Sequence, residues 1–203
     1  MADIIATLTS IYVLFGTASI IISVSLFCQA FSFFKPSVTK YKNLARISLG
    51  IALGFLAILG TLMGTKLPNG TIVNVRELAA MIAGIAGGPL AGAIAGLIGG
   101  VQRYTVGGAT ALSCTISTVF IGLIAGLISS KITGRFFLLK AAALGLVLES
   151  GAMGLILLLV QPFNTATNIV SQIAIPMISA NTIGLTVWVY LAYSWKNKKQ
   201  IKV

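Results

Sequence analysis

Long, continuous apolar runs separated by short polar segments organise the chain. The runs cover residues 4–34, 47–63, 76–104, 109–130, 141–160 and 169–193. Apolar residues follow one another in these runs without the alternation of β-barrel strands, so only helices can satisfy the backbone hydrogen bonds in a bilayer. The pattern therefore predicts an all-α integral membrane protein of about six helical segments.

Composition also indicates a protein that lipid surrounds. Hydrophobic residues make up 57% of the 203 residues and charged residues only 8%, whereas soluble domains carry roughly 25% charged residues. The chain has no histidine, and its only side-chain carboxylates are Asp3, Glu77 and Glu149, which leaves little material for hydrolytic or metal chemistry. Cys28 and Cys114 lie in apolar runs, where a disulfide framework is not expected. We therefore expect no catalysis by this chain, no metal and no cofactor.

The net charge of +11 comes mainly from short basic clusters between the apolar runs. The clusters are Lys35, Lys40, Lys42 and Arg46, then Lys131, Arg135 and Lys140, and finally Lys196, Lys198, Lys199 and Lys202. Cytoplasmic loops of membrane proteins carry an excess of lysine and arginine, so all three clusters are expected in the cytoplasm. This topology places the N-terminus outside and the C-terminus inside, and it explains the charge without a nucleic-acid partner.

The run at residues 76–104 decides between two topologies. Its glycines recur every four residues, a spacing that lets helix backbones approach closely: Gly84, Gly88, Gly92, Gly96 and Gly100. A single spanning helix, kinked at Pro89, suits this unbroken register but would send the later basic clusters outside. A turn at residues 87–89 gives a hairpin of two short helices and keeps the clusters inside. Each arm, at about 20 to 24 Å, is shorter than the bilayer core, so it must pack inside protein or lie in a thinned bilayer.

Two arginines, Arg76 and Arg103, stand at the ends of this hairpin and should meet at the same outer level. The segment that follows is a glycine-containing loop entering a helix N-terminus, where free backbone amides and the helix dipole favour an anion. Ser113, Cys114 and Ser117 share one face in the first two turns of that helix. Two guanidinium groups beside such donors predict a site for a carboxylate or a phosphate.

The candidate ligand-binding residues are Arg76, Arg103, Cys114, Ser117, Ser113, Asn74 and Gly108. An internal salt bridge is the alternative, in which Glu77 or Glu149 neutralises an arginine. Glu149 is expected near the middle of its helix and could reach at most one arginine. Glu77 is expected to point away from Arg76 by about 100° on a helix.

The same residues carry a resemblance to a known family. The strings NGTIVNVREL, IAGIAGGPLAGAIAGLIGG and RYTVGGATALSCTIS closely resemble the LytS-type five-transmembrane receptor domain of bacterial histidine kinases and diguanylate cyclases. The resemblance implies signal reception in the bacterial inner membrane, usually by homodimers. A pyruvate-sensing kinase of the family binds its ligand through two arginines, a cysteine and a serine, which match Arg76, Arg103, Cys114 and Ser117. The domain is also distantly similar to the substrate-binding subunits of energy-coupling vitamin transporters.

These observations lead to one functional hypothesis and two alternatives. Residues 1–203 are expected to form a single membrane sensor domain, with a first helix and basic loop (1–46), a receptor core (47–193) and a basic cytoplasmic tail (194–203). The domain would bind a pyruvate-like or other short carboxylate at its outer face and signal to a cytoplasmic kinase or cyclase. No such output domain precedes Val203. The alternatives are a transporter subunit that binds a small solute and a purely structural anchor.

Overall fold

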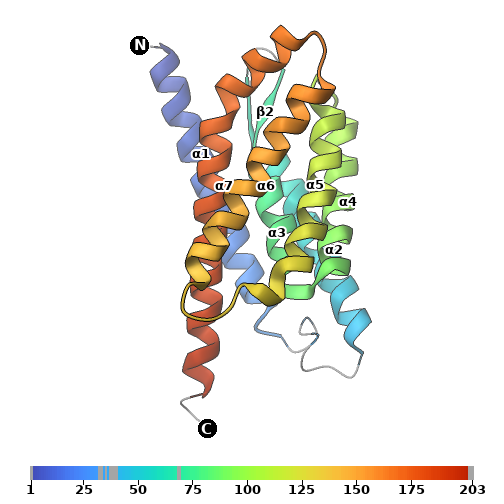
Figure 1. Cartoon of the computed structure of the whole chain (residues 1–203), viewed down its shortest axis with the longest axis vertical. Coiled ribbons are helices and arrows are strands. Elements are labelled where there is room, and N and C mark those ends of the chain that lie inside the picture. Colours follow the sequence, from blue (N-terminus) through green and yellow to red (C-terminus); the bar gives the residue numbers. More distant parts are fainter. Residues whose placement is uncertain (1, 32–33, 35, 37–40, 68–69, 201–203) are drawn as a thin grey trace.

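A computed structural model of the chain describes residues 2–31, 34, 36, 41–67 and 70–200, with side chains from residue 9 to residue 195 of these ranges. The described part is almost entirely helical, which confirms the all-α class (Figure 1). Its α-helices are α1 (Ala2–Cys28), α2 (Lys42–Leu62), α3 (Arg76–Gly87), α4 (Pro89–Val106), α5 (Ala111–Ile128), α6 (Phe137–Leu159) and α7 (Phe163–Gln200). A short 3-10 helix, η2 (Ser129–Lys131), follows α5, and strands β1 (Thr65–Lys66) and β2 (Ile72–Val73) pair in antiparallel fashion.

Five of these helices are long and apolar enough to cross a membrane, namely α1, α2, α5, α6 and α7. Their outward faces carry large exposed apolar side chains, such as Phe55, Leu139 and Leu158. Contiguous apolar surface of this kind is stable beside lipid but not in water. The chain is therefore a multi-pass membrane protein.

Helices α3 and α4 form the expected hairpin, and the alternative of one kinked helix is wrong. The turn is made by Gly88, whose φ of 84° lies in the left-handed region that only glycine adopts at no steric cost. Pro89 follows as the first residue of α4, where its missing N–H is not needed for the helix. The two residues therefore end one helix and start the next within a single turn.

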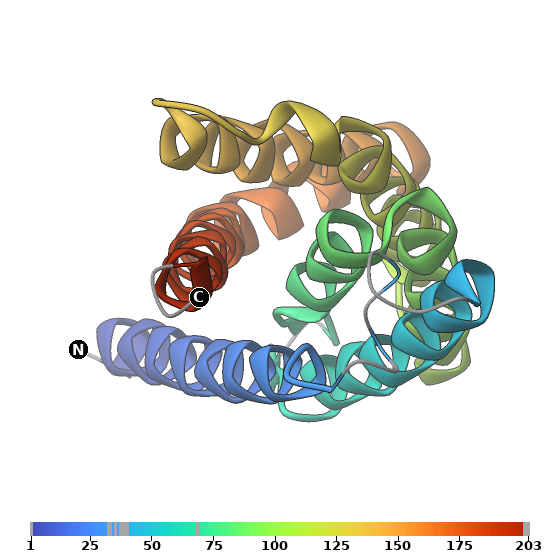
Figure 2. The same cartoon turned by 90° about the horizontal axis from the view of Figure 1, so that it is seen from below.

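Helix α3 is the centre of the bundle. It contacts α1, α2, α4, α5 and α7, which surround it when the molecule is seen from below (Figure 2). All side chains from residue 78 to residue 83 are fully buried. At about 18 Å, the helix is too short to span a bilayer, but protein rather than lipid covers it. Of the two explanations for the short arms, packing inside protein therefore holds for α3, and a thinned bilayer is not needed.

Glycines allow α4 and α5 to pack with their backbones in contact. A Cβ atom added at Gly92 would collide with the Gly122 carbonyl, and one added at Gly122 would collide with Gly92. A Cβ atom added at Gly96 would lie only 2.7 Å from the Thr118 carbonyl oxygen. This close approach brings the α5 face that carries Ser113, Cys114 and Ser117 toward the hairpin.

The glycine interface predicts a steep cost for one methyl group. Gly92→Ala is expected to lower the free energy of unfolding by about 1 to 3 kcal/mol, because the backbones of α4 and α5 must separate. Gly154→Ala in α6 is the matched control, since no atom lies within 4 Å of its added Cβ. Thermal unfolding in one detergent compares the variants, and equal melting temperatures would contradict the close packing.

Several helix boundaries differ from the sequence prediction. The segment at residues 161–168 was expected to be a loop, but α7 already begins at Phe163. The carbonyl of Pro162 accepts hydrogen bonds from the N–H groups of Thr165 and Ala166, which nucleates the helix at this point. Helix α6 begins at Phe137 instead of residue 141, and α1 ends at Cys28 instead of residue 34. Polar residues thus extend α7 but do not change the path of the chain.

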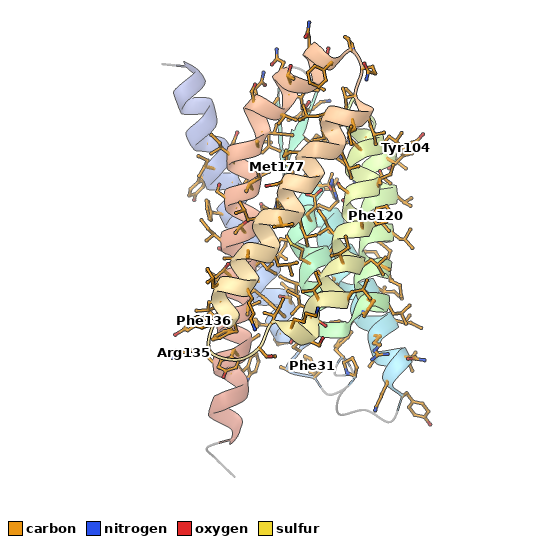
Figure 3. All side chains as sticks on the ribbon, viewed as in Figure 1. Phe31, Tyr104, Phe120, Arg135, Phe136 and Met177 are labelled. Carbon is orange, nitrogen blue, oxygen red and sulfur yellow. The ribbon has the colours of Figure 1, made fainter. Side chains whose placement is uncertain are left out.

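The basic segments lie at one end of the bundle, as the topology requires. The start of α2, the link between α5 and α6, and the end of α7 share the lower end in Figure 1. Arg135 lies at this end in Figure 3, whereas Tyr104, the neighbour of Arg103, lies toward the other. The side chains of Lys35, Lys40 and the tail beyond Trp195 are outside the described residues. We expect the basic end to face the cytoplasm.

Labelling of introduced cysteines tests this orientation. Thr105→Cys, at an exposed position near the end of α4, is expected to react with a membrane-impermeant thiol reagent in intact cells. Arg135→Cys is the matched control at the basic end and should react only after permeabilisation. The parent cysteines add little background from the outer side, since Cys114 is buried and Cys28 ends α1 near the basic end. The reverse labelling pattern would overturn the orientation.

Candidate functional site

Both arginines of the hairpin are fully buried. Arg76 is the first residue of α3 and Arg103 lies in the last turn of α4, so the hairpin brings them to corresponding ends of its arms. Each has a relative exposure of 0%. Surrounding helices and the following loop therefore cover both side chains. A buried guanidinium group needs acceptors or a counter-charge.

Arg76 is held by Glu77 and by α5. Its Nη2 lies 2.7 Å from Glu77 Oε1, and its Nε donates to Thr118 Oγ1 at 2.7 Å. The same Nη2 also donates to the carbonyl of Cys114 at 3.4 Å. The expectation that Glu77 points away is wrong, because both side chains are long enough to converge beyond the helix surface. The salt-bridge alternative thus holds for Arg76.

Arg103 has no carboxylate partner among the residues that the structure describes. Its Nη1 donates to the carbonyl of Gly107 at 2.6 Å and its Nη2 to Thr110 Oγ1 at 2.9 Å. Both acceptors are neutral, so they satisfy hydrogen bonds without balancing the charge. The salt-bridge alternative therefore does not apply to Arg103, whose buried positive charge is uncompensated by the contacts in this structure.

The polar face of α5 joins the two arginines. Ser113, Cys114 and Ser117 are all buried, as their spacing predicts. The Cys114 side chain interacts with both guanidinium groups. Ser117 Oγ is within hydrogen-bond distance of two acceptors, the Cys114 carbonyl at 3.0 Å and Glu77 Oε1 at 3.3 Å. Ser113 Oγ donates to the carbonyl of Thr110 within its own turn. Cys114 and Ser117 are thus part of the arginine cluster, and Ser113 supports the loop beside it.

Asn74 and Gly108 shape the backbone around the arginines. The Oδ1 atom of Asn74 accepts a hydrogen bond from the Arg76 N–H at 3.1 Å, which satisfies one of the free donors at the start of α3. Gly108 has a φ of 93°, and a Cβ atom there would lie 4.0 Å from Arg103 Nη2. These two residues position the arginines, and the contacts give neither a donor aimed at a ligand.

Sequence reasoning missed two threonines that hold the guanidinium groups. Thr118 follows Ser117 and is four residues beyond Cys114, so the helical spacing that selected Cys114 could also have selected it. Thr110 directly precedes α5, where threonine is a common first residue before a helix. Both side chains are buried, with relative exposures of 0% and 1%. Spacing and position could thus have identified both threonines, but a threonine in an apolar run more often bonds to the backbone of its own helix.

Unpartnered donors remain on the arginines. Arg76 Nη1 and Arg103 Nε are buried and have no hydrogen-bond partner in the structure. Buried donors are normally satisfied, so each points to a ligand or a water at this position. Two positively charged donor groups beside a thiol and a hydroxyl can bind a planar anion through charge-assisted hydrogen bonds.

A separate cavity lies far from the arginines. It has a volume of about 440 Å³ and is lined by Ile128, Lys131, Ile132, Thr133 and Lys140 at the basic end. Its lysines are exposed, and membrane topology already explains their position. The arginine cluster remains the candidate site, because it contains two buried guanidinium groups with unpartnered donors.

Known proteins resemble most of this chain. The sensor histidine kinase BtsS of Escherichia coli K12 is 38% identical over 140 residues, which are 66% of this chain and 25% of the relative. The sensor protein LytS of Bacillus subtilis is 39% identical over 120 residues, 58% of this chain and 20% of the relative. The sensor histidine kinase/phosphatase LytS of Staphylococcus aureus Mu50 is 33% identical over 136 residues, 65% of this chain and 23% of the relative.

The chain thus spans a quarter or less of the length of these relatives. No solved structure matches it. A family profile described as 5TMR of 5TMR-LYT matches residues 28–194, which include the hairpin and the arginine cluster. The chain therefore belongs to the LytS-type five-transmembrane receptor family, as a membrane sensory domain.

Proposed function

We propose that this domain binds a small carboxylate at the arginine cluster and passes the signal to a cytoplasmic output domain. The observation that carries the proposal is the fully buried Arg103, which has only neutral acceptors and lies beside Cys114 and the Arg76–Glu77 pair. A bound anion would balance its charge. The sensor kinases among the relatives support a role in signalling.

The donors of the site favour a short, planar carboxylate. At this site, Arg76 Nη1 and Arg103 Nε are buried guanidinium donors without a partner. A carboxylate can accept from both, and the nearby Cys114 thiol and Ser117 hydroxyl can contact a neighbouring oxo or hydroxyl group. The N-terminus of α5 adds a favourable dipole. A pyruvate-like acid has this arrangement of oxygens and is small enough for a buried site.

Ligand entry requires movement near the start of α5. Both arginines are covered, and the segment between α4 and α5 carries Gly107 and Gly108, with φ values of 76° and 93°. Its peptide groups contact Arg103 directly through the Gly107 carbonyl. Binding would therefore change the conformation of this loop and the position of α5. Because α5 packs against α6 and α6 against α7, the change would reach the end of α7.

Calorimetry on the purified chain in detergent tests the proposal. A panel of pyruvate, lactate, acetate, succinate and inorganic phosphate is titrated into the parent and into Arg135→Ala, a control at the basic end. We expect saturable, one-site binding of at least one short monocarboxylate to both proteins. If the parent binds no carboxylate, or if Arg135→Ala loses the binding that the parent shows, the result would contradict an anion site at the arginines.

A further inference from the structure

A second buried polar pair lies between α6 and α7. Glu149 of α6 and Asn181 of α7 each have a relative exposure of 0%. Both carboxyl oxygens of Glu149 and both polar side-chain atoms of Asn181 are buried and lack a hydrogen bond of good geometry. The two side chains nevertheless interact with each other. A carboxyl group this deep in a membrane bundle is rarely retained without a function.

The charged groups that act on Glu149 belong to the arginine cluster. Glu77 and Arg76, both on α3, are within electrostatic range of it. Helix α6 also packs against α5 and α7, whose other titratable groups with described side chains are Cys114, Tyr190 and Tyr193. The two tyrosines lie toward the basic end of α7, and Lys140 is in the first turn of α6. The charges that act on Glu149 are therefore one carboxylate and one guanidinium group, which already pair with each other.

This environment favours an uncharged Glu149. As a carboxylate it would be buried without a counter-charge of its own, because Arg76, the cation that acts on it, already contacts Glu77 at 2.7 Å. An unpaired buried carboxylate costs far more than a neutral carboxyl group. As a neutral acid, Glu149 gains an O–H donor, and Asn181, with which it interacts, carries the unpartnered acceptor Oδ1.

We propose that Glu149 holds a proton at neutral pH and thereby sets the charge of the anion site, so that the site selects singly charged carboxylates. The buried groups then consist of two guanidinium charges, one carboxylate and one neutral acid, which leaves one positive charge in excess. A monoanion balances this charge, whereas a dianion overcompensates it and an uncharged ligand leaves Arg103 unbalanced. Glu149 acts through its charge state and does not touch the ligand. The inference rests on the proposed function.

Infrared spectroscopy tests the proton without any ligand. A protonated, buried carboxyl group has a C=O stretching band distinct from those of carboxylates and amides. We expect this band in the parent at neutral pH, its shift in deuterated buffer, and its loss in Glu149→Gln. Glu77→Gln is the matched control and should keep the band. Absence of the band from the parent, or its survival in Glu149→Gln, would overturn the assignment, whatever the domain binds.

The charge of the preferred ligand tests the selection. Calorimetry compares pyruvate with malonate for the parent, Glu149→Gln and Glu77→Gln. Glu149→Gln replaces one neutral group by another and should keep the parent's preference for pyruvate, with a Kd within about threefold. Glu77→Gln removes a real negative charge and should shift the preference toward malonate by about tenfold or more.

Two results would overturn the charge balance. A shift toward malonate in Glu149→Gln would show that Glu149 is ionised in the parent. A parent that binds malonate as tightly as pyruvate would show that the site does not select by charge. If Glu77→Gln does not fold, the parent and Glu149→Gln still decide between these outcomes. A parent that binds no carboxylate but shows the infrared band would refute the proposed function while leaving the proton on Glu149.

Discussion

Arg103→Ala is expected to weaken carboxylate binding by about ten- to a hundredfold or more, because it removes a charge-assisted interaction of roughly 1.5 to 3 kcal/mol. The fold should survive. Arg103 donates to the Gly107 carbonyl and the Thr110 hydroxyl and has no carboxylate partner among the described residues, so its removal leaves no buried charge without a partner. Calorimetric affinity and thermal unfolding of the same samples separate the two effects.

The variant Arg103→Lys tests whether the shape of the guanidinium group, as well as its charge, contributes to the affinity. Arg103→Lys keeps the charge but loses the planar fork, so it should recover only part of the affinity. Arg135→Ala, an exposed arginine that stacks over Phe136 at the basic end, is the control for loss of a positive charge elsewhere. Full affinity in Arg103→Ala for every carboxylate that the parent binds would remove Arg103 from the site.

Arg76→Ala is expected to destabilise the fold, by about 3 to 5 kcal/mol, as well as to reduce binding. The difference from Arg103 lies in the partner. Arg76 neutralises Glu77, which is buried with a relative exposure of 1%, and removing Arg76 leaves that carboxylate unpaired in the centre of the bundle. Thermal unfolding measures the loss, and Arg103→Ala serves as the comparison.

A double variant identifies the cause. Arg76→Ala combined with Glu77→Gln removes both charges, so it should recover a large part of the stability that Arg76→Ala loses, but not the binding. A double variant as unstable as the sum of its single variants would show that the two charges do not stabilise each other. Arg76 would then owe its burial to the hydrogen bonds with Thr118 and Cys114.

The sequence alone predicted the membrane class, favoured the hairpin over one kinked helix, and indicated one face of the candidate site. The distribution of lysine and arginine required an even number of crossings between the basic clusters, and Gly88 with Pro89 offered the place to turn. The spacing of Ser113, Cys114 and Ser117 put them on one face of a helix whatever packs against it. These features follow from local periodicity and from the cost of charge in lipid, which act on short stretches of chain.

Only the tertiary structure decided which charges pair and how deep they lie. Arg76 binds Thr118, 42 positions away, and Glu77 reaches back to its neighbour in spite of the helical angle between them. Glu149 comes within electrostatic range of Glu77 only because α6 packs against α5 and α7, which both contact α3. Pairing depends on distances of a few ångströms between side chains on separate helices, and a helical pattern specifies a direction but not the neighbour that lies in it.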